Sequence, residues 1–256
     1  MHNDISETVG LSSRAKQTVL LETLRMNDSS PVLLITGASS GIGAATARHA
    51  AEAGYRLVLA ARSEDKLEKL AGELGGGARA LALRCDVTSW EDQQAAVQTA
   101  VERFGRLDAS FANAGFGAAR GFLEESIEHW RSMIDTNVYG CALSIRAALG
   151  QFREQSSGHM LLTGSVAGRR ALPGSLYSAT KWAVTAMGEA LRAEVADTPL
   201  RTTLIEPGMV DTPFFDEKPT GALEPDDIAR AVVYTLTQPA HVDVNEILIR
   251  PVNQPI

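Results

Sequence analysis

Val32-Leu33-Leu34-Ile35-Thr36-Gly37-Ala38-Ser39-Ser40-Gly41-Ile42-Gly43 is the stretch that decides the fold. Residues 32–36 are apolar up to a closing threonine and predict a buried strand, and helical periodicity follows over Ile42–Ala53. A glycine-rich turn between a strand and a helix brings backbone N–H groups and the positive helix end against a bound anion. The stretch therefore predicts a strand–turn–helix unit that binds the pyrophosphate of a dinucleotide.

The glycine spacing is Gly37-x-x-x-Gly41-x-Gly43, which differs from the Gly-x-Gly-x-x-Gly pattern of the general dinucleotide fingerprint. Glycine is needed where a Cβ would block the phosphate or strain the turn. Small residues also serve tight packing between a strand and a helix, so the spacing alone leaves both interpretations open.

Short apolar runs alternate with amphipathic stretches along the chain. The predicted strands are Val32–Thr36, Arg56–Ala60, Ala80–Cys85, Leu107–Ala112, Met160–Thr163, Thr202–Ile205 and Glu246–Ile249. The predicted helices are Ile42–Ala53, Glu64–Leu74, Trp90–Phe104, Ile127–Phe152, Leu176–Val195 and Pro225–Thr237. Strict alternation implies a parallel, doubly wound sheet, and strands that are apolar throughout fit helices on both faces.

We therefore predict a single α/β domain of the Rossmann type over residues 31–256, with a seven-stranded parallel sheet. Its ligand should lie outside the carboxyl ends of the strands. Residues 1–30 are polar and turn-rich at their ends, and we expect a loosely docked N-terminal extension. The alternative is that Met26 is the true translation start.

The amino-acid composition excludes or disfavours several classes of protein. The 256 residues are 45% hydrophobic and 21% charged, which excludes wholesale disorder. A net charge of −7 without a Lys/Arg block disfavours general nucleic-acid binding. The two cysteines, Cys85 and Cys141, are too few for a disulfide framework or a cysteine-based metal site. With no apolar run of roughly 20 residues and no signal-peptide pattern, we expect a cytoplasmic protein.

The end of the second predicted strand indicates which dinucleotide binds. It reads Ala60-Ala61-Arg62-Ser63, with no carboxylate before Glu64. NAD sites usually place an acid about 20 residues beyond the glycines, whereas an arginine accommodates a 2′-phosphate. The forked donors of a guanidinium suit that phosphate. We therefore predict NADP, the alternative being that Arg62 is a solvated residue at a helix entrance.

A tyrosine and a lysine begin the helix predicted over Leu176–Val195, in the sequence Tyr177-Ser178-Ala179-Thr180-Lys181. Residues four apart share a helix face, so Tyr177 and Lys181 point the same way. An ammonium about 4 Å from a phenol would lower the phenol pKa by roughly two to three units. Tyr177 then becomes a general base. Taken alone, this spacing is also typical of surface pairing.

Ser165 closes another predicted strand in Leu162-Thr163-Gly164-Ser165, at a carboxyl strand end that faces the same crevice. A hydroxyl there donates a hydrogen bond to a substrate carbonyl as negative charge builds on its oxygen. The alternative is a loop serine bonded to its own backbone.

The glycine pattern, Ser165 and Tyr177-x-x-x-Lys181, in this order, resemble the short-chain dehydrogenase/reductases from about Val32 to the C-terminus. The resemblance implies that Tyr177 exchanges a proton with the substrate oxygen while Ser165 orients that oxygen. It also implies that Lys181 bonds the nicotinamide ribose and that Asn137 holds a water in a proton relay. Hydride would move between nicotinamide and the substrate carbon.

The same resemblance implies further cofactor contacts. Asp86-Val87 is similar to the family's adenine-contacting acid, and Asn113-Ala114-Gly115 to its Asn-Asn-Ala-Gly signature, with Ala112 in place of the first Asn. Residues 207–212 resemble its Pro-Gly-x-Val-x-Thr loop. The implied cofactor-binding set is Gly37, Ser39, Ser40, Gly41, Ile42, Gly43, Arg62, Asp86, Val87, Asn113, Ala114, Gly115, Tyr177, Lys181, Pro207, Gly208, Val210 and Thr212. No metal is expected.

The substrate is indicated less specifically. In the family, the segment that corresponds to residues 211–224 here recognises the substrate. Phe214 and Phe215 lie in this segment, where they form either an apolar lid over a small substrate or simply pack against each other. Arg169 and Arg170 follow the Ser165 strand closely and either attract a substrate carboxylate or are solvated loop charges.

The C-terminal segment Gln238–Pro251 resembles the branch with NADP-dependent 3-hydroxy acid dehydrogenases and lacks the Gly-Gly ending of 3-oxoacyl carrier-protein reductases. We expect hydride transfer to or from a secondary alcohol or carbonyl, such as a small 3-hydroxy acid or aldehyde. A bulkier ketone or a 3-oxoacyl thioester is the alternative. A non-catalytic NADP-binding regulator and an NAD-dependent sugar epimerase are alternatives of other classes. The resemblance also implies a homo-oligomer, a tetramer or a dimer.

Overall fold

A seven-stranded sheet runs through the described residues of this computed structural model, which are 30–215, 217 and 219–254. The strand order is β3-β2-β1-β4-β5-β6-β7, and every neighbouring pair is parallel. The strands are β1 (Val32–Thr36), β2 (Arg56–Ala61), β3 (Ala80–Arg84), β4 (Ala109–Ala112), β5 (Gly158–Thr163), β6 (Leu200–Pro207) and β7 (Glu246–Ile249). The predicted Rossmann-type α/β fold is confirmed.

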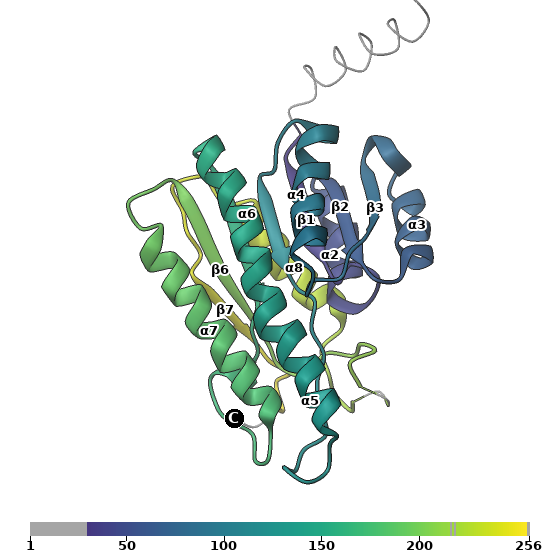
Figure 1. Cartoon of the computed structure of the whole chain (residues 1–256), viewed down its shortest axis with the longest axis vertical. Coiled ribbons are helices and arrows are strands. Elements are labelled where there is room, and N and C mark those ends of the chain that lie inside the picture. The colour runs from purple at the N-terminus through teal and green to yellow at the C-terminus, as the bar shows by residue number, and fades with distance from the viewer. Residues whose placement is uncertain (1–29, 216, 218, 255–256) are drawn as a thin grey trace, which may run out of the picture. The chain divides into compact units, whose positions relative to one another are not determined.

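Helices cover both faces of the sheet (Figure 1). They are α2 (Gly41–Glu52), α3 (Glu64–Glu73), α4 (Trp90–Phe104), α5 (Ile127–Ile134), α6 (Cys141–Gln155), α7 (Leu176–Glu194) and α8 (Pro225–Leu236). One face packs against α2, α3 and α8, and the other packs against α4, α6 and α7. Pro31–Ile256 forms one compact unit. The predicted extension over residues 1–30 lies, Ser30 apart, outside the described residues.

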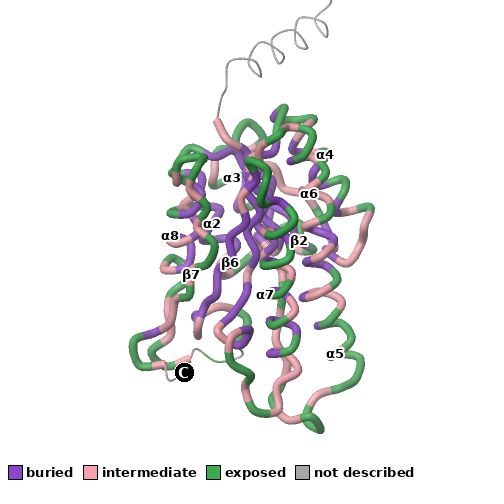
Figure 2. The backbone as a smooth tube through the Cα atoms, turned by 90° about the vertical axis from the view of Figure 1, so that its left-hand side faces the viewer, coloured by how far each residue is buried: buried purple, intermediate pink, exposed green. Residues whose placement is uncertain are grey.

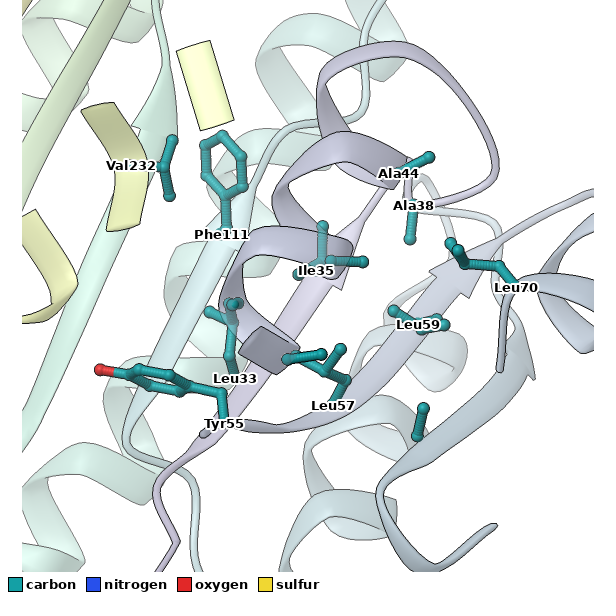
Figure 3. Close-up of a cluster of buried hydrophobic side chains, with 14 of the residues drawn as sticks. Leu33, Ile35, Ala38, Ala44, Tyr55, Leu57, Leu59, Leu70, Phe111 and Val232 are labelled. Atoms are coloured by element: carbon teal, nitrogen blue, oxygen red, sulfur yellow. The ribbon is translucent and has the colours of Figure 1, made fainter. Parts of the chain in front are cut away.

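Adjacent strand residues point to opposite faces, which explains why the strands are apolar throughout. In β1, Leu33 and Ile35 belong to the core under α2 and α8, whereas Val32 and Leu34 belong to the core under α4 and α6. Figure 3 shows Leu33 and Ile35 in their cluster, together with Phe111 of β4. Burial accordingly concentrates in the strands, and the outer helix surfaces are exposed (Figure 2). No helix of the described residues is long and apolar enough to cross a membrane.

The helix predicted over Ile127–Phe152 is present and runs from Ile127 to Gln155, but a π-helical segment, Asp135–Gly140, interrupts its α-helical geometry between α5 and α6. The wider turn carries Asn137, which is buried and bonds backbone and side-chain groups of other elements. Gly140 ends the segment, and a Cβ there would lie only 2.8 Å from Cγ2 of Val87. Segments of this kind are frequent at functional sites, and apolar periodicity does not reveal them.

A histidine is buried in β5. His159 is 1% exposed, and its Nε2 lies 2.8 Å from Oγ1 of Thr203. That hydroxyl donates its own hydrogen to the Val244 carbonyl at 2.6 Å, so the Nε2–H of a neutral imidazole must be the donor to Thr203. Burial, helped by the charge of Arg201, lowers the pKa of His159 to about 3.

His159 should make folding sensitive to mild acid. Its folded-state pKa of about 3 lies below the ordinary value of 6.5, so its stabilising contribution is present above pH 6.5 and is lost as the pH falls. Between pH 7 and pH 5 this group should remove about 2 kcal/mol from the free energy of unfolding. Urea titrations at pH 7 and pH 5 measure this loss. In His159→Gln the free energy of unfolding should lack this part of the pH dependence, and in the control His241→Gln, at an exposed site, it should keep it. An unchanged pH dependence in His159→Gln would contradict the assignment.

Candidate active site

A cleft of about 650 Å³ lies at the carboxyl ends of the strands. Because the strands are parallel, the loops that follow them all reach this edge. The predicted residues in its lining are Gly37, Ser39, Ser40, Gly41, Ile42, Arg62, Asp86, Val87, Asn113, Ala114, Gly115, Ser165, Tyr177, Lys181, Pro207, Gly208, Val210 and Thr212. Gly43 and Asn137, the other two, lie behind that lining. The described residues contain no cluster of three His, Cys, Asp or Glu side chains that could hold a metal ion.

The glycine-rich loop is shaped to bring backbone close to a ligand. A Cβ on Gly43 would lie 2.3 Å from the Gly37 carbonyl oxygen, so only glycine fits there. Gly37 has a φ of +67°, a conformation that costs a Cβ-bearing residue strain. Ser40 begins α2 without a side-chain capping bond, and the first helical turn carries no acid. The positive helix end is therefore free to meet a phosphate.

The side chain of Asn113 joins this loop to the catalytic end of the cleft. Its Nδ2 donates to the Thr36 carbonyl at 3.1 Å, and its Oδ1 accepts from Thr163 Oγ1 at 3.1 Å. The Thr163 carbonyl in turn accepts from Lys181 Nζ at 2.8 Å. A chain of hydrogen bonds therefore runs across the ends of β1, β4 and β5.

Arg62 and Asp86 line the far end of the cleft, beyond the glycine-rich loop. Asp86 accepts hydrogen bonds from the backbone N–H and the hydroxyl of Thr88, at 3.0 and 2.8 Å. The first of these bonds is the main reason why the pKa of Asp86 lies below its usual value, and the charge of Arg62 contributes. Within the described part of the chain no carboxylate lies within ion-pair distance of the exposed Arg62 side chain.

Tyr177, Ser165 and Lys181 converge at the other end. Ser175 accepts a hydrogen bond from the Ser178 N–H, so α7 begins at Leu176 and Tyr177 lies in its first turn. The Ser165 hydroxyl lies close enough to Tyr177 to favour the ionised form of its phenol. Lys181 Nζ lies 5.6 Å from the centroid of the Tyr177 ring. The geometry brings together a phenol, a second hydroxyl and an ammonium in one cleft.

The predicted lowering of the phenol pKa is wrong for the protein alone. Burial of the hydroxyl end raises the pKa of Tyr177 to about 12, and the nearby Ser165 hydroxyl only opposes this rise. Burial likewise lowers the pKa of Lys181 to about 8. The sequence argument counted the charge of the ammonium and not the removal of water from both groups. Tyr177 therefore carries its proton at neutral pH.

Asn137 is oriented from several sides. Its Oδ1 accepts from the Phe116 N–H at 3.0 Å, and its Nδ2 donates to the Phe116 carbonyl at 2.9 Å and to Thr180 Oγ1 at 3.1 Å. A Cβ on Gly115 would lie 3.0 Å from that same Oδ1 and 3.7 Å from Lys181 Nζ. Gly115 therefore lies close to both the Asn137 amide and the Lys181 ammonium.

Phe214 covers Tyr177. Its ring lies edge-on to Tyr177 with centroids 5.3 Å apart, and the Phe215 ring makes a second edge-on contact with Phe214 at 5.0 Å. The opposite wall is Gly117, where a Cβ would lie only 2.5 Å from Cζ of Phe214. Both phenylalanines line the cleft. Of the two interpretations offered by the sequence, this contact favours the lid.

Arg169 does not face the cleft as a free cation. Its Nε donates to both carboxylate oxygens of Glu206, at 2.9 and 2.8 Å, and its Nη2 pairs with Glu246. Burial raises the pKa of Glu206, and the hydrogen bond and charge of Arg169 oppose that rise. The interpretation of Arg169 as a carboxylate attractor is therefore wrong, and Arg170 is an exposed residue that does not line the cleft.

Several contributors were missed by sequence reasoning. Thr163 and Thr180 act through a backbone carbonyl and a hydroxyl, which no motif marks. Gln254, near the C-terminus, lines the cleft and accepts from the Met209 N–H at 2.8 Å. The family motif around Asn113 was the one sequence signal near these residues. It identifies Asn113 but not Thr163, the residue that its side chain bonds.

Comparisons with known proteins agree with this geometry. Residues 31–222 match the short chain dehydrogenase family. A Staphylococcus haemolyticus protein described as an uncharacterized oxidoreductase is 42% identical over 225 residues, which cover 86% of this chain and 97% of that protein.

Solved structures are similar over most of the chain. The alcohol dehydrogenase of the archaeon Thermococcus sibiricus, complexed with 5-hydroxy-NADP, is 38% identical with a TM-score of 0.82, covering 88% of this chain and 98% of that one. A serine dehydrogenase complexed with NADP+ is 29% identical with a TM-score of 0.81, covering 88% and 96%. A Burkholderia phymatum short chain dehydrogenase/reductase in complex with NAD is 27% identical with a TM-score of 0.77, covering 86% and 88%. The chain therefore belongs to the short-chain dehydrogenase/reductase family of oxidoreductases.

Proposed function

We propose that the protein is an NADP(H)-dependent oxidoreductase that transfers a hydride between nicotinamide and a secondary alcohol or carbonyl substrate. The proposed substrate is small, such as a 3-hydroxy acid or an aldehyde. The observation that carries the proposal is that Ser165, Tyr177 and Lys181 line the same cleft as the glycine-rich loop. Two hydroxyls side by side can bond one substrate oxygen, as acyl and carbonyl chemistry requires of such a site.

The residues present fit a nicotinamide dinucleotide. Gly37 and Gly43 let the loop pack closely on its own backbone and on that of Ala114, beside the free N-terminal end of α2. Arg62 supports a 2′-phosphate, because the guanidinium lines the cleft at the end of β2 where an NAD site would place an acid. Asp86, held ionised by Thr88, would bond the adenine end. When bound, the nicotinamide supplies or accepts the hydride.

Tyr177, Ser165 and Lys181 would divide the work at the substrate oxygen. Tyr177, protonated at neutral pH, would donate its proton to that oxygen in the reductive direction. In the oxidative direction its deprotonated form, the phenolate, would accept the alcohol proton. Ser165 donates a hydrogen bond to the same oxygen and orients it. Lys181, anchored on the Thr163 carbonyl, holds positive charge close to the phenol. Asn137 fixes the backbone of Phe116 beneath them and remains the proposed water-holding group.

A small substrate is favoured over a bulkier ketone or a 3-oxoacyl thioester. The ring of Phe214 closes the space between Tyr177 and Gly117, so a large acyl group would have to displace it.

A homo-oligomer, a tetramer or a dimer, belongs to the same proposal. Large apolar side chains are exposed on the described residues of α5, the π-helical segment and α7, among them Ile127, Tyr139 and Trp182. The cytoplasm remains the proposed location, and the free, buried thiols of Cys85 and Cys141 support a reducing compartment.

Tyr177→Phe tests the catalytic assignment. The variant removes only the hydroxyl, so turnover of a small carbonyl with NADPH should fall about 10²- to 10⁴-fold, while the Kd of NADPH stays within twofold. Tyr139→Phe, at an exposed tyrosine, is the matched control and should keep full turnover. Full activity in Tyr177→Phe would refute the role of the phenol, and a wild-type protein that binds NADPH without any turnover would support a regulator instead.

Arg62→Ala tests the cofactor. Wild-type kcat/KM should be higher with NADPH than with NADH, and the variant should lose about 10- to 100-fold with NADPH because a charge-assisted hydrogen bond is removed. Its kcat/KM with NADH should change little. Lys66→Ala, an exposed cation on neighbouring α3, is the control. Equal use of both cofactors by the wild type would end the NADP proposal.

Phe214→Ala tests the lid. The kcat/KM for a bulky aryl ketone should rise roughly tenfold, and that for a small aldehyde should fall. Gly117→Ala should change the same ratio in the same direction, because its new methyl group displaces the Phe214 ring. Tyr234→Ala, an exposed aromatic on α8, should leave both substrates unaffected. An unchanged ratio in both cleft variants would show that the rings do not limit substrate size.

A further inference from the structure

Glu206 is a fully buried carboxylate next to the catalytic cleft. It is the penultimate residue of β6 and is 0% exposed, yet it does not line the cleft. The next residue, Pro207, does line the cleft, and its carbonyl accepts a hydrogen bond from Ser165 Oγ at 3.5 Å. Removing a carboxylate from water is costly unless the charge is paired and hydrogen-bonded. The proposed proton transfers do not use the Glu206 carboxylate, so its burial beside the cleft indicates another role.

The partners of Glu206 come from separate elements. Arg169 donates from Nε to both carboxylate oxygens, and Thr185 of α7 donates its hydroxyl to Oε1 at 3.1 Å. Arg169 also pairs with Glu246 at the start of β7 and lies 3.8 Å from Glu189 of α7. The carboxylate is therefore the meeting point of β6, the loop after β5, and α7.

The loop that carries Ser165 is fixed to this carboxylate at both ends. Before the serine, a Cβ on Gly164 would lie 2.9 Å from Cγ of Glu206, so the backbone packs directly on the side chain. After it, a single tight turn leads to Arg169, with the Gly168 N–H donating to the Ser165 carbonyl at 2.8 Å. Ser165 thus lies between two contacts to the same carboxylate.

The helix that carries the tyrosine is fixed to it as well. Thr185 lies one helical turn beyond Lys181 and two turns beyond Tyr177, so the three share a face. Gly168 packs against this turn, since a Cβ on it would lie 2.7 Å from the Lys181 carbonyl oxygen and 2.8 Å from Thr185 Oγ1. The carboxylate therefore sets the spacing between the Ser165 loop and α7.

We propose that Arg169 and Glu206 are positioning residues, whose buried ion pair holds the Ser165 hydroxyl at the correct place relative to Tyr177. The inference rests on the proposed oxidoreductase function, because it assumes that Ser165 acts on the substrate oxygen. Stability alone does not explain the pair, since well-packed apolar residues of similar volume are often as stable as a buried ion pair. A bifurcated contact from a planar guanidinium fixes direction as well as distance.

Glu206→Gln removes the charge and keeps the size of the side chain and an acceptor for Thr185. We expect kcat to fall 10- to 100-fold while the KM and the Kd for NADPH stay within threefold. Amide hydrogen exchange of residues 165–168, measured without cofactor or substrate, should become at least tenfold faster. Unchanged kcat and unchanged exchange would overturn the proposal.

A double-mutant cycle separates positioning from general destabilisation. If the pair acts through Ser165, then Ser165→Ala and the double variant Ser165→Ala/Glu206→Gln should have the same kcat within threefold. Losses that multiply would show that the pair does not act through the serine and would also overturn the proposal.

Arg169→Lys gives an independent test should Glu206→Gln not fold, because the Arg169 side chain is 29% exposed and a lysine keeps the charge. It lacks the planar guanidinium, so kcat should still fall about tenfold and the exchange should still accelerate. Arg170→Lys, at the exposed neighbour, and Arg48→Gln, in the exposed ion pair with Glu73, should change neither quantity. Wild-type kcat and exchange in Arg169→Lys would contradict the role of the guanidinium.

The outcome also separates this inference from the proposed function. A Ser165→Ala variant with full turnover would refute the assignment of Ser165 in the reaction. The exchange measurement needs no turnover, so it decides in that case whether the ion pair orders residues 165–168. A wild-type enzyme that needs Ser165 and tolerates loss of the pair would retain the proposed function and refute only the positioning role.

Discussion

The hydrogen bonds of the Asn113 amide are the interaction on which the site depends. Parallel strands bring their carboxyl ends to one edge of the sheet. The loops that follow these strands must still be held in place relative to one another. Asn113 bonds the Thr36 carbonyl on one side and Thr163 on the other, and Thr163 bonds Lys181. The glycine-rich loop and α7, which carries Tyr177 and Lys181, are thereby positioned by one continuous chain of contacts.

Much of this edge consists of polar groups withdrawn from water. Asn137, Lys181 and Glu206 are all at least 95% buried, and each has hydrogen-bond partners that meet its polar atoms. Such networks are expensive when incomplete and rigid when satisfied. The partners come from different strands and helices, so the order of the catalytic groups is a property of the whole sheet edge.

The ionisation state of the catalytic pair illustrates the same point. Spacing on a helix places Tyr177 and Lys181 on one face, and a charge argument from that spacing lowers the phenol pKa. In the folded protein, burial dominates and raises the pKa of Tyr177 to about 12. Desolvation depends on everything that packs around a group, so it cannot be predicted from a spacing of four residues along a helix.

The sequence by itself determined the alternation of strands and helices, the parallel sheet and the cluster of Gly37, Ser165 and Tyr177 at one edge. Those features follow from local periodicity and from the rule that parallel strands end together. Only the tertiary structure decided that a π-helical segment lies between α5 and α6 and that Arg169 faces a buried carboxylate instead of solvent. Both depend on contacts between residues far apart in the chain, and hydrophobic patterning carries no information about which distant polar groups will meet.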